Sequence, residues 1–92
     1  MEIELCGHPW DERAETTVRT ALAPLAAMGV RDVYVLRFAS APTGTWRAWA
    51  NLEDGRDCSV KSNRGPCETP FDELPQLLEQ IHLAVLVLVA AA

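Results

Sequence analysis

The sequence predicts an α+β fold with the element order β-α-β-β-β-α, in which a curved antiparallel sheet carries two helices packed on one face. Three observations lead to this fold: an amphipathic helical pattern in the first third of the chain, three short β-rich segments in the middle, and a second apolar helical pattern near the end. With 92 residues, 49% of them hydrophobic, the chain has enough apolar side chains for one core but not for two. We therefore treat residues 1–92 as a single domain.

The N-terminal part predicts one strand and one helix. Acidic and apolar residues alternate over residues 2–5, which is the period of a half-buried strand. Asp11 is placed to cap a helix whose apolar stripe recurs in steps of three and four over residues 14–28. Pro24 removes one backbone hydrogen bond, so we expect a kink or a tightened last turn there, and Gly29 is expected to stop the helix.

The middle of the chain predicts three antiparallel strands in a meander. Residues 32–39 and 45–52 are rich in β-branched and aromatic side chains, and residues 56–62 form a shorter third strand. The pair Asp54-Gly55 is a strong hairpin signal, and we expect a type I′ turn in which both residues have positive φ.

The C-terminal part predicts a second helix. Pro75 is not expected deep inside a helix, so a short turn over residues 70–74 should precede a main helix that starts at Pro75. Its predicted buried stripe consists of Leu77, Leu78, Ile81, Val85 and Leu88.

Residues 83–92 are apolar on every side, and one small sheet covers only one side of a helix. Two outcomes are expected: the segment packs against a second copy, or its end becomes an edge strand. We favour a homodimer, with self-association through Leu83, Leu86, Val87 and Val89.

Alternation within each strand assigns the side chains to two faces. Placing the more apolar set of each strand against the helices puts Tyr34, Leu36 and Phe38 in the core. The uncovered face then displays the four residues that we interpret as partner-binding, with Val33 and Val35 nearby: Arg37, Arg47, Trp49 and Lys61. Trp and Arg anchor many protein interfaces, and a tryptophan beside arginines can also stack a nucleobase. The alternative is that Trp49 only packs across strands.

The charge distribution favours a protein partner. The net charge of −5 and the pI near 4.8 argue against a protein that binds nucleic acid over its whole surface. The charge is −3 over residues 1–30, +2 over residues 31–64 and −4 over residues 65–92. Faces of opposite sign suit oriented docking on another protein.

Without its first strand, the element order resembles that of double-stranded-RNA-binding domains, in topology alone. That family grips phosphates with lysines at the start of its second helix, whereas residues 65–92 contain no Lys or Arg. RNA binding by that route is therefore not expected.

The sequence offers one possible metal set and no catalytic motif. Three cysteines and one histidine could form a structural zinc site, but the paired C-x₂-C spacing is missing: Cys6, His8, Cys58 and Cys67. No phosphate-binding loop, nucleophile elbow or H-E-x-x-H is present. We therefore expect neither a cofactor nor enzyme activity.

These features together predict a small acidic protein-binding module. By analogy of size and charge it would be an inhibitor or adaptor, similar to immunity proteins or to phage anti-CRISPR proteins. Its alternative docking surface would be acidic and would compete with nucleic acid: Asp11, Glu12, Glu15, Asp72, Glu73 and Glu79. The other two hypotheses are a nucleic-acid-binding sheet that uses the Arg and Trp face, and a zinc or thiol protein. The acidic N-terminal segment predicts the cytoplasm and no membrane partner.

Overall fold

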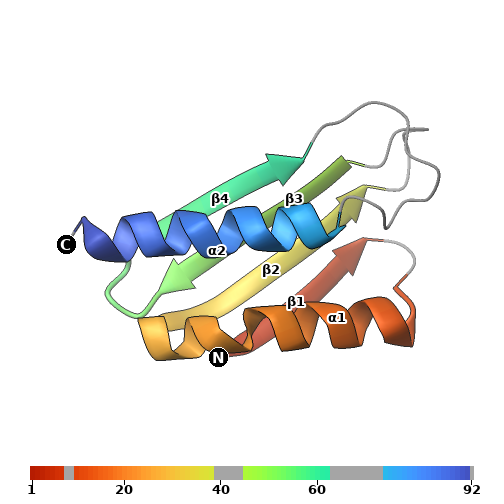
Figure 1. Cartoon of the computed structure of the whole chain (residues 1–92), viewed down its shortest axis with the longest axis horizontal. Coiled ribbons are helices and arrows are strands. Elements are labelled where there is room, and N and C mark those ends of the chain that lie inside the picture. Colours follow the sequence, from red (N-terminus) through yellow and green to blue (C-terminus); the bar gives the residue numbers. More distant parts are fainter. Residues whose placement is uncertain (8–9, 39–44, 63–73, 92) are drawn as a thin grey trace.

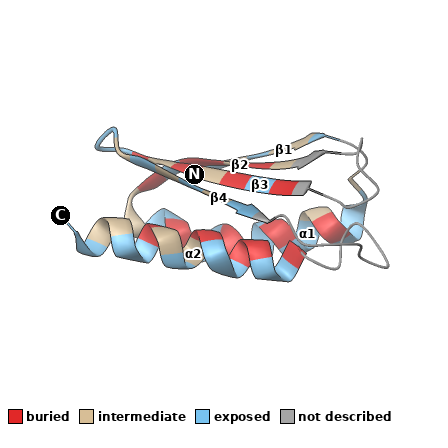
Figure 2. Cartoon of the chain, turned by 90° about the horizontal axis from the view of Figure 1, so that it is seen from above, coloured by how far each residue is buried: buried red, intermediate tan, exposed pale blue. Residues whose placement is uncertain are grey.

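The computed structural model describes residues 1–7, 10–38, 45–62 and 74–91. Its elements are β1 (Glu2–Gly7), α1 (Glu12–Leu22), the 3₁₀ helix η1 (Ala23–Met28), β2 (Val30–Phe38), β3 (Thr45–Leu52), β4 (Asp57–Ser62) and α2 (Leu74–Ala90). Both helices cover the same face of a four-stranded sheet, as the two views of the chain show (Figure 1, Figure 2). The α+β class and the placement of both helices on one face are confirmed.

The sheet is mixed rather than wholly antiparallel. Its strand order is β1-β2-β3-β4, and the β2-β3 and β3-β4 pairs are antiparallel as predicted. The strand β1 instead runs parallel to β2, so the expectation of an antiparallel first strand is wrong. The reason is the connection, because a helix that crosses over one face returns the chain to the end where β1 began.

The two ends of the first helical segment form as the sequence predicts. Asp11 accepts a hydrogen bond from the backbone N–H of Ala14 at 2.7 Å and so caps α1. At Pro24 the helix tightens from α to 3₁₀ geometry. Gly29 ends the segment with φ +85°, a left-handed conformation that glycine adopts without a steric penalty.

The β3-β4 hairpin lies where it was predicted, but its turn is not type I′. No non-glycine residue of the described chain has a positive φ, whereas Gly55 has φ +94°. The backbone N–H of Leu52 donates to the carbonyl of Arg56 at 2.8 Å, which closes a three-residue loop with glycine in the left-handed position. The Asp54 carboxylate accepts from the Arg56 N–H at 3.0 Å, a local bond that favours this longer loop.

The core lies between the sheet and the two helices. Trp46 is its largest fully buried side chain, and Trp10 packs against it edge to face, with 5.4 Å between the ring centroids. The indole N–H of Trp10 donates to the carbonyl of Cys6 at 2.9 Å, so this contact also ties β1 to the start of α1. The other buried hydrophobic residues come from every described helix and from β2 and β3: Ala14, Val18, Leu22, Leu25, Val30, Val33, Val35, Ala48, Ala50, Leu52, Leu74, Leu77, Leu78, Ile81 and Val85.

The faces of β2 are the reverse of those predicted. Val33 and Val35 are fully buried, whereas Tyr34 and Leu36 are half-buried on the opposite face. The pairing with β3 explains this, because both valines lie opposite small alanines that face the helices, and Tyr34 lies opposite Trp49. The side chain of Phe38 lies outside the described part of the chain.

The tail remains helical, so the expectation of an edge strand there is wrong. The helix α2 continues to Ala90, and its predicted stripe is buried up to Val85 and half-buried at Leu88. Arg56 donates from Nη1 to the carbonyl of Leu88 at 2.7 Å. This bond supplies a cation to the end of a helix whose own last turn contains none.

The reversed faces of β2 predict unequal costs of truncation. Val35→Ala should lower the free energy of unfolding by about 2 kcal/mol, because it removes buried methyl groups and leaves a cavity. Leu36→Ala should cost less than about 1 kcal/mol, because that side chain is only half-buried, on the open side of the sheet. Urea unfolding of both variants checks this, and a larger loss for Leu36→Ala would mean that the strand is turned the other way.

Candidate functional site

The face of the sheet opposite the helices is not covered by any described element (Figure 2). We call it the open face. The pairing of the strands arranges its residues in three rows across the sheet. The first is a basic row (Cys6, Leu36, Arg47, Lys61), the second an aromatic row (Glu4, Tyr34, Trp49, Ser59), and the third an acidic row (Glu2, Asp32, Asn51, Asp57).

The aromatic row contains a stacked pair. Tyr34 and Trp49 are direct cross-strand partners, with ring centroids 5.6 Å apart and ring planes inclined by 26°. Both side chains are half-buried, so part of each ring is exposed. The pair therefore gives the middle of the open face an aromatic surface that solvent and ligands can reach.

The basic row presents two exposed cations. Arg47 and Lys61 are cross-strand partners, and neither forms an ion pair with another described residue. Successive residues on one face of a strand are about 7 Å apart, so both cations lie one step from the aromatic pair. A base on the aromatic row and a phosphate on the basic row can therefore be contacted together.

The acidic row contains a carboxylate that is held in place by two hydrogen bonds. Asp32 is 9% exposed, and it accepts hydrogen bonds from Nδ2 of Asn51 at 2.6 Å and from Nε of Arg31 at 3.0 Å. The bond from Asn51 lowers the pKa of Asp32 most, the bond and charge of Arg31 lower it further, and burial opposes them. Negative charge is thus held about 13 Å along the strands from Arg47 and Lys61.

Three of the four predicted partner-binding residues share the open face: Arg47, Trp49 and Lys61. The backbone of Arg37 pairs with that of Trp46, and its side chain lies outside the described part of the chain. The prediction missed Tyr34 as an open-face residue. The sequence places Tyr34 in an aromatic-rich strand, but only the pairing with Trp49 shows on which face of the sheet it lies.

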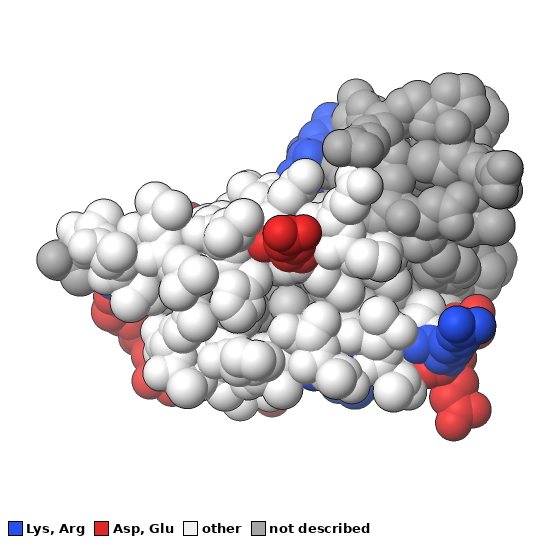
Figure 3. Space-filling view, in the orientation of Figure 1, with Lys and Arg blue, Asp and Glu red and all other residues white. Residues whose placement is uncertain are grey.

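A second surface lies on the helix side. The described residues of that face include few charged side chains (Figure 3), and Glu79 is the only Asp, Glu, Lys or Arg of α2. Leu83, Leu86 and Val87 are 53%, 41% and 70% exposed, whereas Val89 packs partly against the core.

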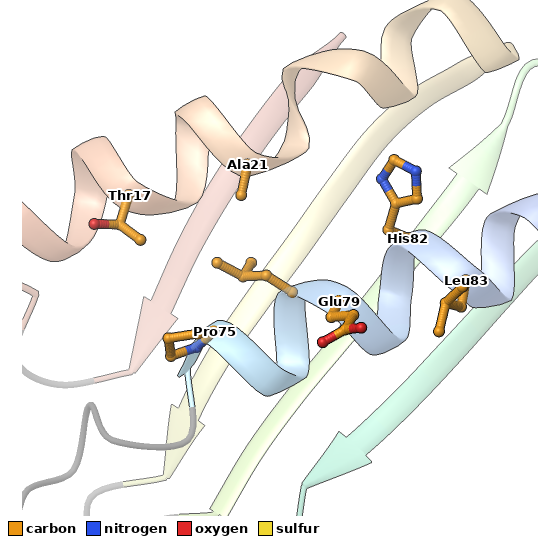
Figure 4. Close-up of a pocket in the computed structure, with 7 residues that line it drawn as sticks. Thr17, Ala21, Pro75, Glu79, His82 and Leu83 are labelled. Atoms are coloured by element: carbon orange, nitrogen blue, oxygen red, sulfur yellow. The ribbon is translucent and has the colours of Figure 1, made fainter.

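A groove of about 460 Å³ runs between the two helices on the same side. Figure 4 shows Thr17 and Ala21 on its α1 side and Pro75, Glu79 and His82 on its α2 side. The exposed Leu83 also lines it, so the groove adjoins the exposed apolar residues of α2.

Within the described chain, three acidic residues of the alternative docking surface lie together at the start of α1, and Glu79 lies apart from them on α2. Asp11 caps α1, and Glu15 pairs with Arg19 at 3.2 Å one turn later. Glu12 is exposed in the first turn of α1, and Glu79 lines the groove between the helices. Asp72 and Glu73 lie outside the described residues.

The hypothetical zinc set is not assembled. Cys6 is on the open face of β1, and Cys58 is on β4 opposite Ala50, which faces the helices. Three strand spacings, about 14 Å, separate these two thiols, so they cannot share one metal ion. Burial and then the charge of Asp57 raise the pKa of Cys58, which disfavours the thiolate. His8 and Cys67 lie outside the described residues, and the described part holds no metal-binding group of three His, Cys, Asp or Glu side chains.

The comparisons with known proteins give a likeness of fold. No family model and no curated protein matches this sequence. Among solved structures, one described as a ribosomal subunit interface protein from Coxiella burnetii matches with a TM-score of 0.77. That match covers 98% of this chain and 99% of the other at 11% identity, so what it shows is the fold. No helix of the described chain is long and apolar enough to cross a membrane.

The expectation of a protein inhibitor, similar to immunity or anti-CRISPR proteins, is wrong. The structural match over almost the whole of both chains is to a ribosome-associated protein, and it gives no support to an inhibitor. The expectation rested on size and net charge, which average over all faces of the molecule. A negative net charge does not exclude a local group of cations, such as Arg47 and Lys61 on the open face.

The acidic row predicts a pH-dependent contribution to stability. Asn51→Ala should destabilise the fold at about pH 7, because Asp32 loses its shortest hydrogen bond. The folded pKa of Asp32 is lowered, so its stabilising effect is present above the ordinary value of 3.8 and is lost as the pH falls through the lowered pKa. Urea unfolding at about pH 7 and about pH 2 measures the free energy of unfolding of Asn51→Ala and wild type. The difference between the two proteins should be smaller at about pH 2. In an Asp32→Asn background the effect of Asn51→Ala should be the same at both pH values, and a pH-dependent effect there would contradict the assignment.

Proposed function

We propose that this chain binds single-stranded RNA on its open face and acts by binding rather than catalysis. The observation that carries the proposal is the stacked pair of Tyr34 and Trp49, which is half-buried on the open face and one step from the cations of Arg47 and Lys61. Aromatic surfaces beside cations are how proteins hold unpaired bases and their phosphates without reading a sequence.

The likeness of fold favours RNA as the partner. A ribosomal subunit interface protein has the same architecture, and the ribosome is built largely of RNA. The open face is also unsuited to a duplex, because a stacked aromatic pair binds bases whose faces are accessible. A ribosomal partner is also in keeping with the cytoplasmic location expected from the sequence.

The charge layout limits how RNA can bind. The chain has a net charge of −5, so a phosphate backbone is repelled by most of the surface. On the open face, Glu2 and Asp57 of the acidic row are exposed. The aromatic row separates them from the basic row. The RNA strand should therefore lie across the aromatic and basic rows. Because only two cations contact it, its affinity should depend only weakly on the salt concentration.

The first test is RNA binding by variants of the open face. Trp49→Ala should weaken binding of an oligoadenylate of about eight nucleotides roughly tenfold, because a stacked base contributes about 1–3 kcal/mol. Arg47→Ala should reduce the slope of log affinity against log salt by about 0.7, the value for one phosphate contact to a single strand. Fluorescence anisotropy of the labelled RNA, titrated from about 20 mM to about 200 mM salt, measures both.

The matched control is Arg13→Ala, which removes an exposed cation from α1 on the other side of the molecule. It should bind RNA like wild type. Equal loss in this variant, or the absence of wild-type binding at the lowest salt, would contradict the proposal. A DNA oligonucleotide of the same sequence tests whether the sugar contributes to recognition.

We also propose that a second copy of this chain is the partner of the helix side. Two copies with a net charge of −5 each repel one another, and this repulsion is least where charged side chains are few. The helix side meets that condition and exposes Leu83, Leu86 and Val87. The sheet side stays available in such a dimer, so the two proposals are compatible.

If two copies pack through their helix sides, a charge introduced into the contact should prevent the dimer from forming. Val87→Lys should convert the dimer to a monomer, because it buries an unpaired cation at the contact. Added positive charge lowers the overall repulsion, so general electrostatics cannot account for this loss. Multi-angle light scattering at high micromolar concentration measures the mass, with Thr16→Lys on the exposed side of α1 as control. A wild-type monomer under these conditions would overturn the proposal.

A further inference from the structure

We infer that the open face contains a single nucleobase site, on the outer face of the Trp49 ring above Ser59. The inference rests on the proposed function and names its ligand as one unpaired base of an RNA strand. It follows from the geometry of the aromatic row and from the difference between the two ends of that row.

The stack leaves two ring faces for a ligand. Because Tyr34 and Trp49 stack on one another, each ring turns one face toward its partner and the other face away from it. The outer face of Tyr34 is toward β1, where Glu4 is its direct neighbour. The outer face of Trp49 is toward β4, where Ser59 is its direct neighbour.

The two ends differ in space and in charge. Glu4 is an exposed carboxylate, and Glu2 lies next to it on the same face of β1. A nucleotide at that end would bring its phosphate close to two negative charges. Ser59 is exposed, small and uncharged, and its hydroxyl can donate to or accept from the edge of a base. The Trp49 end therefore favours a base, and the Tyr34 end disfavours one.

The neighbouring side chains orient the nucleotide. Lys61 and Asp57 are the open-face residues on either side of Ser59 along β4, each about 7 Å away. Arg47 is the cross-strand partner of Lys61, so both cations lie on the same side of the base. The phosphate should point to Arg47 and Lys61 and away from Asp57.

The capacity of the site is one base. The strand β4 is at the edge of the sheet, so no described strand beyond it supplies a second aromatic platform. A purine offers more stacking area than a pyrimidine, whereas Ser59 is the one described residue paired with Trp49 on β4 whose side chain can hydrogen-bond the base. The site should thus prefer purines modestly and read little sequence.

The test fills one end of the stack at a time. Ser59→Leu should weaken binding of the oligoadenylate about tenfold, because the new side chain occupies the place of the base. Glu4→Leu puts the same side chain at the other end and should bind at least as well as wild type. Ser59→Ala keeps the space open and should stay within about threefold of wild type, the cost of one hydrogen bond to water-exposed atoms. Circular dichroism of all three variants verifies that each is folded.

Intrinsic fluorescence gives an independent readout. A base stacked on Trp49 should quench its emission on titration with the oligoadenylate, and Trp49→Phe should remove the quenching while keeping part of the affinity. Trp10 and Trp46 lie on the helix side of the sheet and should not respond.

The outcomes separate this inference from the proposed function. If Glu4→Leu weakens binding and Ser59→Leu does not, the base lies on Tyr34 and the inference is wrong, although RNA binding stands. If folded Ser59→Leu and Glu4→Leu both bind like wild type, no base stacks at either end, and the inference is again wrong. If the wild-type chain binds no RNA, the proposed function itself fails.

Discussion

The pairing register between β2 and β3 determines both the core and the open face. It places Val33 and Val35 opposite Ala50 and Ala48, and these four side chains face the helices. The small alanines allow the helices to approach the sheet, and the valines belong to the same core cluster as Trp46. A shift of one residue would exchange the two faces of β2, bury Tyr34 and expose the valines. The aromatic stack therefore exists because the core is packed in this register.

The open face separates charge along the strands rather than between its edges. Arg47 and Lys61 lie at one end, the aromatic pair lies in the middle, and the fixed carboxylate of Asp32 lies at the other end. Such an arrangement gives a ligand an orientation as well as a place, because only one end attracts phosphate. An acidic protein can thus carry a localised site for an anion, and its acidic remainder discourages binding elsewhere.

Local signals in the sequence predicted most of the helices and strands. The features that were predicted wrongly depend on long-range pairing between strands. The cap at Asp11, the tightened turn at Pro24 and the stop at Gly29 depend on neighbouring residues only, and all three are observed. The parallel direction of β1 depends on the crossover through α1. The buried face of β2 depends on the partner strand, since hydrophobicity alone favours burying the set with Phe38 over the set that contains Arg37.

The candidate site was also predicted in part, on those strands whose faces were assigned correctly. Arg47, Trp49 and Lys61 alternate on strands whose faces the sequence assigned correctly, so they appear together. Tyr34 was missed because it is on β2, whose faces were reversed. The function was misjudged because net charge is a property of the whole chain, whereas binding is a property of one surface.

The bond from Arg56 to the carbonyl of Leu88 links the β3-β4 hairpin to the last turns of α2, two segments far apart in sequence. Asp54 holds the same guanidinium at 2.8 Å, so the hairpin presents it to the helix in a fixed position. The helix end has no cation of its own, and opening of the hairpin would leave its terminal carbonyls to the solvent. The hairpin and the end of the helix should therefore open as one cooperative unit, with amide protons that exchange together and apart from those of α1.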